Sequence, residues 1–91
     1  MWSVEFSREA RKQLEKVDAH IENKIVEKIR NLKEWLNGES SAQVDIKRLG
    51  GEWKDFHRIR TGKIRILLSM DNRINTIRIH AIGFRGDVYK K

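Results

Sequence analysis

Apolar and polar residues alternate along much of the second half of the chain, which is the pattern of strands with one buried face. A turn at Thr61-Gly62 divides this region, because Gly62 can take the positive φ that a tight hairpin needs. We therefore predict two paired strands, at about residues 53–60 and 63–70. The second strand should have one apolar and one mainly polar face, formed by Ile64, Ile66, Leu68 and Met70, and by Lys63, Arg65, Leu67 and Ser69.

The first half of the chain predicts a short strand followed by two helices. Residues 2–6 alternate between apolar and polar, and Ser7 and Asp18 are typical helix N-caps. Asn37-Gly38 is typical of a helix end. Apolar residues recur at helical spacing after each cap, namely Ala10, Leu14 and Val17, and then Ile21, Ile25, Ile29, Leu32 and Leu36. Residues 7–37 should therefore form a helical hairpin that packs on a sheet.

A last strand is expected at about residues 74–82, after a turn at Asp71-Asn72. Residues 38–46 have no periodicity and are interpreted as a polar connection, and Gly50-Gly51 as a bend before a strand. Alternation in the last strand places Ile77, Ile79 and Ala81 on one face and Arg78, His80 and Ile82 on the other. The prediction is an α+β fold of order β-α-α-β-β-β, with a helical hairpin on one face of a single small, mostly antiparallel sheet.

Length and composition limit the class of protein. A chain of 91 residues has room for one domain, which we expect to span residues 1–91. The chain contains no cysteine, which excludes disulfides, thiolate nucleophiles and cysteine metal sites. Its N-terminus does not resemble a signal peptide, and no apolar run approaches the roughly 20 residues of a membrane span. We therefore expect a soluble, cytoplasmic protein.

Positive charge is concentrated in the second half of the chain. The net charge is +7, yet residues 1–45 contain eight Lys and Arg against nine Asp and Glu. Residues 46–91 contain twelve Lys and Arg against four Asp and Glu. Such segregation favours a surface that binds a polyanion. A membrane surface is the weaker candidate, because the amphipathic helical region is nearly neutral and its apolar stripe is needed for the core.

Three blocks in a fixed order resemble a known family. They are residues 47–51 (Lys-Arg-Leu-Gly-Gly), the basic hairpin at residues 57–67, and the ending at residues 83–89 (Gly-Phe-Arg-Gly-Asp-Val-Tyr). Together with the short first strand and the helical hairpin, they resemble the RelE/ParE superfamily of toxins from type II toxin–antitoxin systems. The resemblance covers nearly the whole chain and implies the fold predicted above.

The superfamily resemblance implies two possible activities. RelE-like members are ribosome-dependent mRNA endoribonucleases, and ParE-like members poison DNA gyrase; the ending of this chain is more similar to the RelE-like side. The first possibility is a metal-independent endoribonuclease that inhibits translation, with no cofactor. Its implied partners are a cognate acidic antitoxin, the ribosome and mRNA, with no membrane and no metal. The alternative is a gyrase poison of the ParE type, or a catalytically weak relative.

Cleavage of RNA by its own 2′-hydroxyl needs a base, an acid and cations around the phosphate. Carried over by position, the resemblance implies five site residues, Arg58, Arg60, Arg65, Arg85 and Tyr89. Well-known RelE-like toxins have lysines where this chain has Arg58 and Arg60, and arginine does not release its proton in proteins. Either Tyr89, His57 or His80 is therefore the base, or the site works mostly by positioning and electrostatics.

Strand parity separates the two histidines. His80 shares a face with Arg78 and is expected to look toward the basic surface, so it joins the candidate catalytic residues. His57 lies on the face opposite Arg58 and is expected to be packed. The remaining basic residues of the second half are candidates for RNA and ribosome binding, namely Lys47, Arg48, Lys54, Lys63, Arg78, Lys90 and Lys91.

Overall fold

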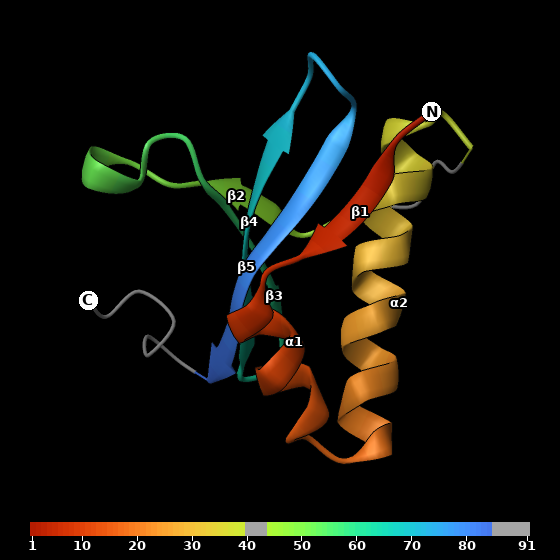
Figure 1. Cartoon of the computed structure of the whole chain (residues 1–91), viewed down its shortest axis with the longest axis vertical. Helices are drawn as coiled ribbons and strands as arrows, with labels where there is room; N and C mark the ends of the chain where they lie inside the picture. The colour runs from red at the N-terminus through yellow and green to blue at the C-terminus, as the bar shows by residue number, and fades with distance from the viewer. Residues whose placement is uncertain (40–43, 85–91) are drawn as a thin grey trace.

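The structure is a computed structural model, and it describes the chain apart from residues 40–43 and 85–91 (Figure 1). Within these described residues, two helices and five strands follow one another, with a single 3₁₀ turn. They are β1 (Ser3–Phe6), α1 (Arg8–Glu15), α2 (Ala19–Leu36), β2 (Ile46–Arg48), the 3₁₀ helix η1 (Gly51–Trp53), β3 (His57–Thr61), β4 (Ile64–Asp71) and β5 (Thr76–Phe84).

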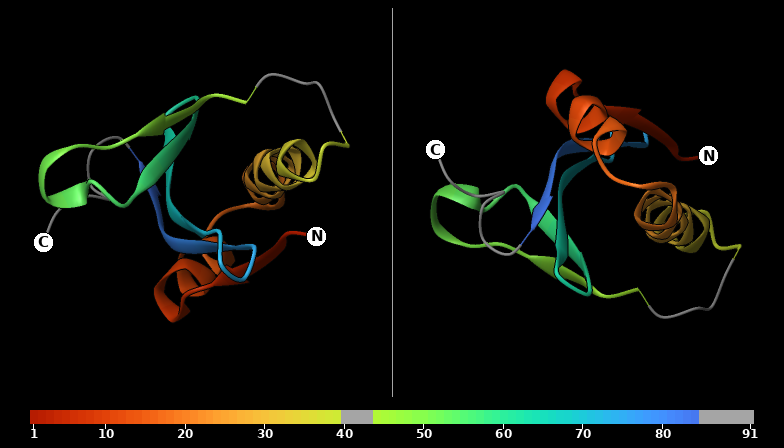
Figure 2. Two further views of the ribbon diagram at one scale, coloured as in Figure 1. Left: turned by 90° about the horizontal axis from the view of Figure 1, so that it is seen from above. Right: turned by 90° about the horizontal axis from the view of Figure 1, so that it is seen from below.

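The strands form one sheet in the order β1-β5-β4-β3-β2. Among the described strands, the β1–β5 pair alone is parallel, and the other three pairs are antiparallel. The long α2 runs along one face of this sheet, and α1 lies by the strands β1 and β5 (Figure 2). The α+β class, the helical hairpin and the mostly antiparallel sheet are therefore confirmed. No helix in the described ranges is long and apolar enough to cross a membrane.

Both helices begin at the caps expected from the sequence. The Ser7 hydroxyl accepts a hydrogen bond from the Ala10 N–H at 3.0 Å, and the Asp18 carboxylate accepts one from the Ile21 N–H at 2.9 Å. Helix α2 ends at Asn37, and Gly38 follows with a φ of 74°. These caps satisfy backbone groups that would otherwise lack partners at the helix ends.

The core lies between the helices and one face of the sheet, which we call the inner face. Its largest fully buried side chains come from α2 and the three central strands, namely Ile25, Leu32, Ile59, Ile66, Leu68, Ile77 and Ile79. Ile64, Ile66 and Leu68 of β4 all belong to this core, as their alternation predicted. The opposite face of the sheet, here the outer face, therefore carries Arg65, Leu67 and Ser69 of β4.

The region before β3 differs from the prediction in two ways. Residues 46–48 form the edge strand β2, although residues 38–46 were expected to be a connection without structure. The strand expected from residue 53 begins only at His57, because residues 51–53 form η1 instead. Gly51 has a φ of 61°, which a strand does not use and which lets the chain turn back from β2 to β3.

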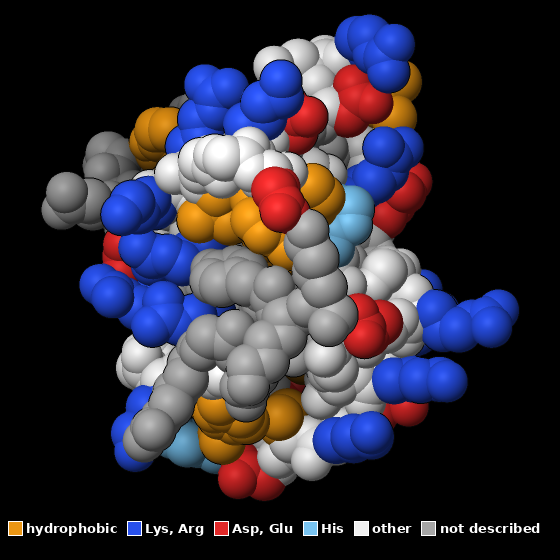
Figure 3. All heavy atoms as spheres, turned by 90° about the vertical axis from the view of Figure 1, so that its left-hand side faces the viewer, with side chains coloured by type: hydrophobic (Ala, Val, Ile, Leu, Met, Phe, Trp, Pro, Cys, Tyr) orange, Lys and Arg blue, Asp and Glu red, His pale blue; other side chains and the backbone are white. Residues whose placement is uncertain are grey.

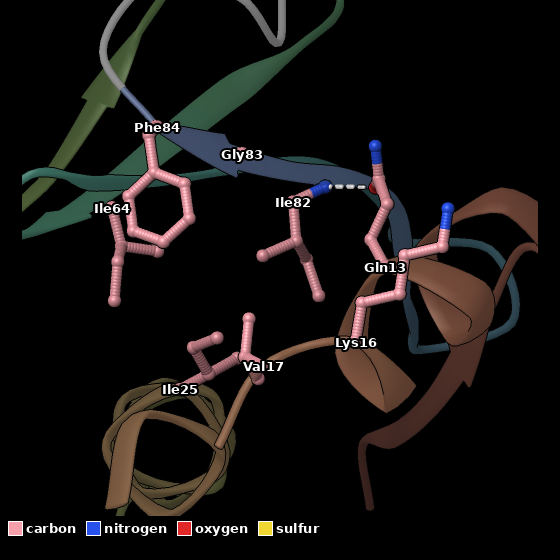
Figure 4. Close-up of a pocket in the computed structure, with 8 residues that line it drawn as sticks. All are labelled: Gln13, Lys16, Val17, Ile25, Ile64, Ile82, Gly83 and Phe84. Atoms are coloured by element: carbon pink, nitrogen blue, oxygen red, sulfur yellow. Dashed lines mark hydrogen bonds between the residues drawn. The ribbon is translucent and has the colours of Figure 1, made fainter.

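An irregularity in β5 corrects the predicted faces of that strand. Leu67 pairs with Ala81 and Leu68 pairs with Ile79, so His80 is the extra residue of a β-bulge. The prediction that Ile82 shares a face with Arg78 and His80 is therefore wrong, as is the placement of Ala81 with Ile77 and Ile79. After the bulge it is Ile82 that joins the core, and Figure 4 shows its side chain pointing toward Val17 and Ile25.

Helix α1 covers the edge of β5 beyond the end of β1. The Ser7 N–H donates to the Ile79 carbonyl at 2.9 Å, and the Ser7 hydroxyl donates to the His80 carbonyl at 2.7 Å. Further along, the Ile82 N–H donates to Oε1 of Gln13 at 2.6 Å (Figure 4). Side chains at the start and in the middle of α1 thus replace the strand that β5 lacks there.

Candidate nucleic-acid interface

The sheet register gathers basic side chains on the outer face. Lys47 of β2 lies directly opposite Arg58 of β3, and Arg60 of β3 lies directly opposite Arg65 of β4. Figure 3 shows this side of the molecule, where Lys and Arg side chains gather beside a patch of hydrophobic side chains. We call Arg58, Arg60 and Arg65 the arginine cluster. The structure thus brings together three of the predicted catalytic residues.

Like charges that face each other across strands destabilise a sheet. Arg60 is only loosely compensated, because its Nε lies 3.9 Å from an Asp45 carboxylate oxygen and both side chains are half exposed. Nη1 of Arg58 and Nε of Arg65 are buried and have no hydrogen-bond partner among the described residues. Buried guanidinium nitrogens without acceptors are costly, and an anion bound at this face would supply acceptors.

Arg78 lies at the other side of the outer face, and its charge is already partly compensated. Its guanidinium contacts Glu5 of β1 at 3.4 Å and Asp71 at the end of β4 at 3.9 Å. Hydrogen bonds from Arg73 are the main cause that holds the pKa of Asp71 below its usual value, and Arg78 adds to it. Arg78 therefore borders the candidate interface with less free positive charge than the arginine cluster has.

His80 lies on the outer face at the bulge and is held from two sides. Its Nε2 lies 2.8 Å from the Ser69 hydroxyl, and its ring meets the Phe56 ring edge to face at a centroid distance of 4.8 Å. Burial, with a smaller contribution from Arg78, lowers the pKa of His80 below its ordinary value of 6.5. A neutral imidazole that can accept a proton near neutral pH is therefore available beside the basic face.

His57 lies on the inner side of the sheet, as expected. It pairs with Arg48 and Leu68 on the neighbouring strands, and its Nδ1 is buried without a hydrogen-bond partner among the described residues. Burial, and then the charge of Arg48, lowers the pKa of His57. With Arg58 on the opposite face, His57 is not placed to act on a phosphate bound there.

The other predicted binding residues are spread more widely. Lys47 lies opposite Arg58 of the arginine cluster, and Lys63 is exposed in the turn between β3 and β4. Arg48 has the opposite parity and donates from its Nε to the carbonyl of Lys54 at 3.2 Å, outside the arginine cluster. Four predicted residues lie outside the described residues, namely Arg85, Tyr89, Lys90 and Lys91.

Two contacts of the site were not foreseen from the sequence. Alternation placed Ser69 on the polar face of its strand but did not pair it with His80, and nothing connected Phe56 with that ring. Ser69 faces Arg78 in the register, and the bulge brings His80 within reach of the Ser69 hydroxyl. The signal that could have found these contacts is therefore the register between β4 and β5, which local alternation does not specify.

A cavity on the other side of the sheet has a mainly apolar lining. This cavity of about 210 Å³ lies between the helices and the ends of β4 and β5, lined by Gln13, Lys16, Val17, Ile25, Ile64, Ile82, Gly83 and Phe84 (Figure 4). It opens on the inner side of the sheet, away from the arginine cluster. Within residues 1–39 and 44–84, no three His, Asp or Glu side chains gather as metal ligands would.

Comparison with known proteins assigns the family. The family model described as the ParE toxin of the type II toxin–antitoxin system parDE matches residues 4–89. The chain belongs to this family. It is therefore a toxin of the RelE/ParE superfamily, as the order of its motifs predicted. Among curated protein sequences, none matches this toxin significantly.

Solved structures of the superfamily share the fold of this toxin. A chain of the RelBE2 toxin–antitoxin complex from Mycobacterium tuberculosis is 27% identical, with 92% of this chain and 98% of that chain covered and a TM-score of 0.75. A chain of the RelB–RelE complex from Methanococcus jannaschii is 28% identical, with coverages of 92% and 93% and a TM-score of 0.69. The isolated RelE toxin of E. coli shares the fold at 15% identity, with coverages of 93% and 85% and a TM-score of 0.72.

Proposed function

We propose that this toxin is a ribosome-dependent mRNA endoribonuclease that needs no metal. The observation that carries the proposal is the arginine cluster, with two buried guanidinium nitrogens from neighbouring strands that lack acceptors on the described part of the chain. A phosphodiester is an anion with several acceptor oxygens, and guanidinium groups bind it in a bidentate manner. The RelE and YafQ structures among its neighbours share the fold of this toxin and are consistent with this proposal.

The proposed reaction proceeds by internal attack. The 2′-oxygen of a ribose forms a bond to the adjacent phosphorus, its proton passes to a base, and the bond from phosphorus to the 5′-oxygen breaks. The leaving oxygen takes a proton from a general acid. We assign the base to His80, since its lowered pKa keeps the ring neutral near neutral pH. Tyr89 and Arg85 stay candidates from the family resemblance, as the acid and as a further ligand of the phosphate.

The arginine cluster would act on charge rather than on protons. Negative charge grows on the non-bridging oxygens as the phosphorus takes a fifth bond, and fixed cations there lower the barrier. Arg65 lies in the central strand β4 and faces Arg60 across the hairpin, so both can approach one phosphate. We assign Lys47, Lys63 and the exposed Arg48 and Lys54 to contacts with the surrounding RNA backbone.

A cognate antitoxin is the second proposed partner. The RelBE2 and RelB–RelE structures are toxin–antitoxin complexes, and both toxin folds match this one. An acidic antitoxin segment would supply carboxylates to the same outer face, which explains how a cell could keep the toxin silent.

The family model also favours a second function. Its description names ParE toxins of parDE systems, and the resemblance links ParE-like members to inhibition of DNA gyrase rather than to RNA cleavage. In that alternative the outer face binds an anionic target without catalysis.

Primer extension on mRNA after induction of the toxin separates the two functions. We expect discrete cuts within translated codons and none in messages whose translation is blocked. Intact mRNA together with broken chromosomal DNA would overturn the endoribonuclease and support the gyrase poison.

Single-turnover cleavage of ribosome-bound mRNA tests the role of Arg65. We expect Arg65→Ala to slow cleavage by about 10²–10³-fold, with a much smaller loss of ribosome affinity, because the group acts on charge that develops in the transition state. Arg65→Lys should recover little, since an ammonium lacks the planar fork of donors. The control Lys54→Ala should lower affinity in a salt-dependent way and leave the rate nearly unchanged. Equal losses of rate and affinity in Arg65→Ala would make Arg65 a docking residue.

A further inference from the structure

We propose that Trp53 and Phe56 form a stacking surface for a nucleobase of single-stranded RNA, next to the phosphate held by the arginine cluster. This inference rests on the proposed function and names the part of the substrate that the outer face would recognise. Three rings carry it, and they lie in a row from the loop between β2 and β3 to the centre of the sheet.

The row is continuous and its rings are half-buried. The Trp53 and Phe56 rings meet edge to face with centroids 5.4 Å apart and planes at 78°. Phe56 in turn meets His80 at 4.8 Å and 61°. The row ends at His80, the proposed base, so a nucleobase stacked on Phe56 would lie beside the reacting ribose.

Backbone hydrogen bonds hold the loop that carries these rings. The Leu49 N–H donates to the Phe56 carbonyl at 3.0 Å, and the Phe56 N–H donates to the Trp53 carbonyl at 2.9 Å. The Arg48 side chain adds a bond to the Lys54 carbonyl. A loop tied in this way loses little conformational entropy on binding, which favours a preformed recognition surface.

These rings do not belong to the hydrophobic core. That core lies on the inner face, and neither Trp53 nor Phe56 is part of it or packs against it. Leu67 and Ala81 are buried on the outer face and also lie outside that core. Aromatic rings beside a cluster of cations are a combination that binds single-stranded nucleic acids.

Charge around the row of rings agrees with an RNA ligand. Phe56 precedes Arg58 by two residues, and Lys47 lies directly opposite Arg58. The loop itself carries two carboxylates, Glu52 and Asp55, and one lysine, Lys54. A base would then lie on the rings and its phosphate on the cluster.

Tryptophan fluorescence can test contact with a base directly. The probe is a short oligoadenylate with 2′-O-methyl riboses, which cannot be cleaved. In a Trp2→Phe, Trp35→Phe chain, where Trp53 is the remaining tryptophan, we expect the oligomer to quench the emission. In the matched Trp2→Phe, Trp53→Phe chain, the remaining Trp35 is 48% exposed on α2, and we expect no quenching.

Binding by the full-length chain provides the second measurement. Trp53→Leu and Phe56→Leu should each weaken oligomer binding by roughly 10- to 100-fold, and Trp53→Phe should bind nearly as the parent does, because stacking needs an aromatic face. Circular dichroism and the thermal midpoint establish that each variant folds.

Three results would overturn the stacking surface. The first is that the parent chain does not bind the oligomer. The second is that the oligomer binds without quenching Trp53 and that Trp53→Leu binds it with unchanged affinity. The third is that a polyglutamate peptide quenches Trp53 equally, which would make the loop a site for acidic peptides. Cleavage of mRNA on the ribosome is measured separately. If Trp53→Leu and Phe56→Leu both cleave ribosome-bound mRNA as fast as the parent chain does, the stacking surface is refuted and the proposed function still stands.

Discussion

At the scale of single residues, the choice of arginine limits what each side chain can do. Arginine does not release its proton in proteins, so Arg58 and Arg60 can provide positive charge but cannot act as the base. His80 is the described outer-face residue with a pKa lowered from a value near neutrality, by burial first and by Arg78 second. The division of labour proposed above follows from these two properties.

The pH dependence of cleavage tests this division. A base must be deprotonated, so the single-turnover rate should fall as the pH drops through the pKa of His80, which lies below 6.5. Arg78→Ala removes one of the two causes that lower this pKa. The acid limb of the profile should therefore move to higher pH in Arg78→Ala.

Two further variants test whether titration of His80 causes the fall in rate at low pH. Lys54→Ala removes an exposed positive charge of the η1 loop and should leave the limb in place. His80→Gln should abolish the limb. If Arg78→Ala leaves the limb where it is in the parent, another group is the base.

At the scale of secondary-structure elements, side chains of α1 and its N-cap satisfy backbone groups of β5 where no neighbouring strand pairs with it. Strand β1 pairs with β5 only from Thr76 to Ile79, and the N–H of Ile82 beyond it is bonded to the Gln13 side chain at 2.6 Å. The bulge at His80 places the Ile82 side chain on the inner face, toward the helices. Helix α1 therefore stabilises the strand that carries His80.

Replacing Gln13 tests this support. Gln13→Met keeps a side chain of similar length but removes the acceptor, which leaves the Ile82 N–H without a partner. We expect a loss of about 1–3 kcal/mol in the free energy of unfolding, measured by urea denaturation. Lys12→Met on the exposed side of α1 is the control and should change stability little. Equal effects of the two substitutions would show that the Gln13 bond does not stabilise β5.

Local pattern predicts elements well where a long period or a specific cap exists. The apolar face of β4 and the caps Ser7 and Asp18 were predicted correctly for that reason. Strand β2 has only three residues, too few for alternation to be recognised. The bulge at His80 arises from cross-strand register, so the true face of Ile82 and the contact between His80 and Ser69 could not be derived from one strand alone.

At the scale of the whole molecule, the fold separates charge from core. The sheet packs its inner face against two helices from the nearly neutral first half, while the outer face collects cations from β2, β3 and β4. Opposed cations on neighbouring strands weaken the isolated sheet, so a partner that brings negative charge to this face stabilises it. RNA and an acidic antitoxin would compete for the same surface.

That competition predicts a strong salt dependence of antitoxin binding. Complementary charge speeds association and is screened by salt, so the toxin–antitoxin complex should dissociate more readily as ionic strength rises. Arg60→Ala removes an exposed cation of the outer face and should make the affinity less sensitive to salt. Lys12→Ala on the exposed side of α1 should leave that sensitivity unchanged. Titration calorimetry at a series of salt concentrations measures both. An affinity that stays constant from low to high salt would place the antitoxin on a surface other than the arginine cluster.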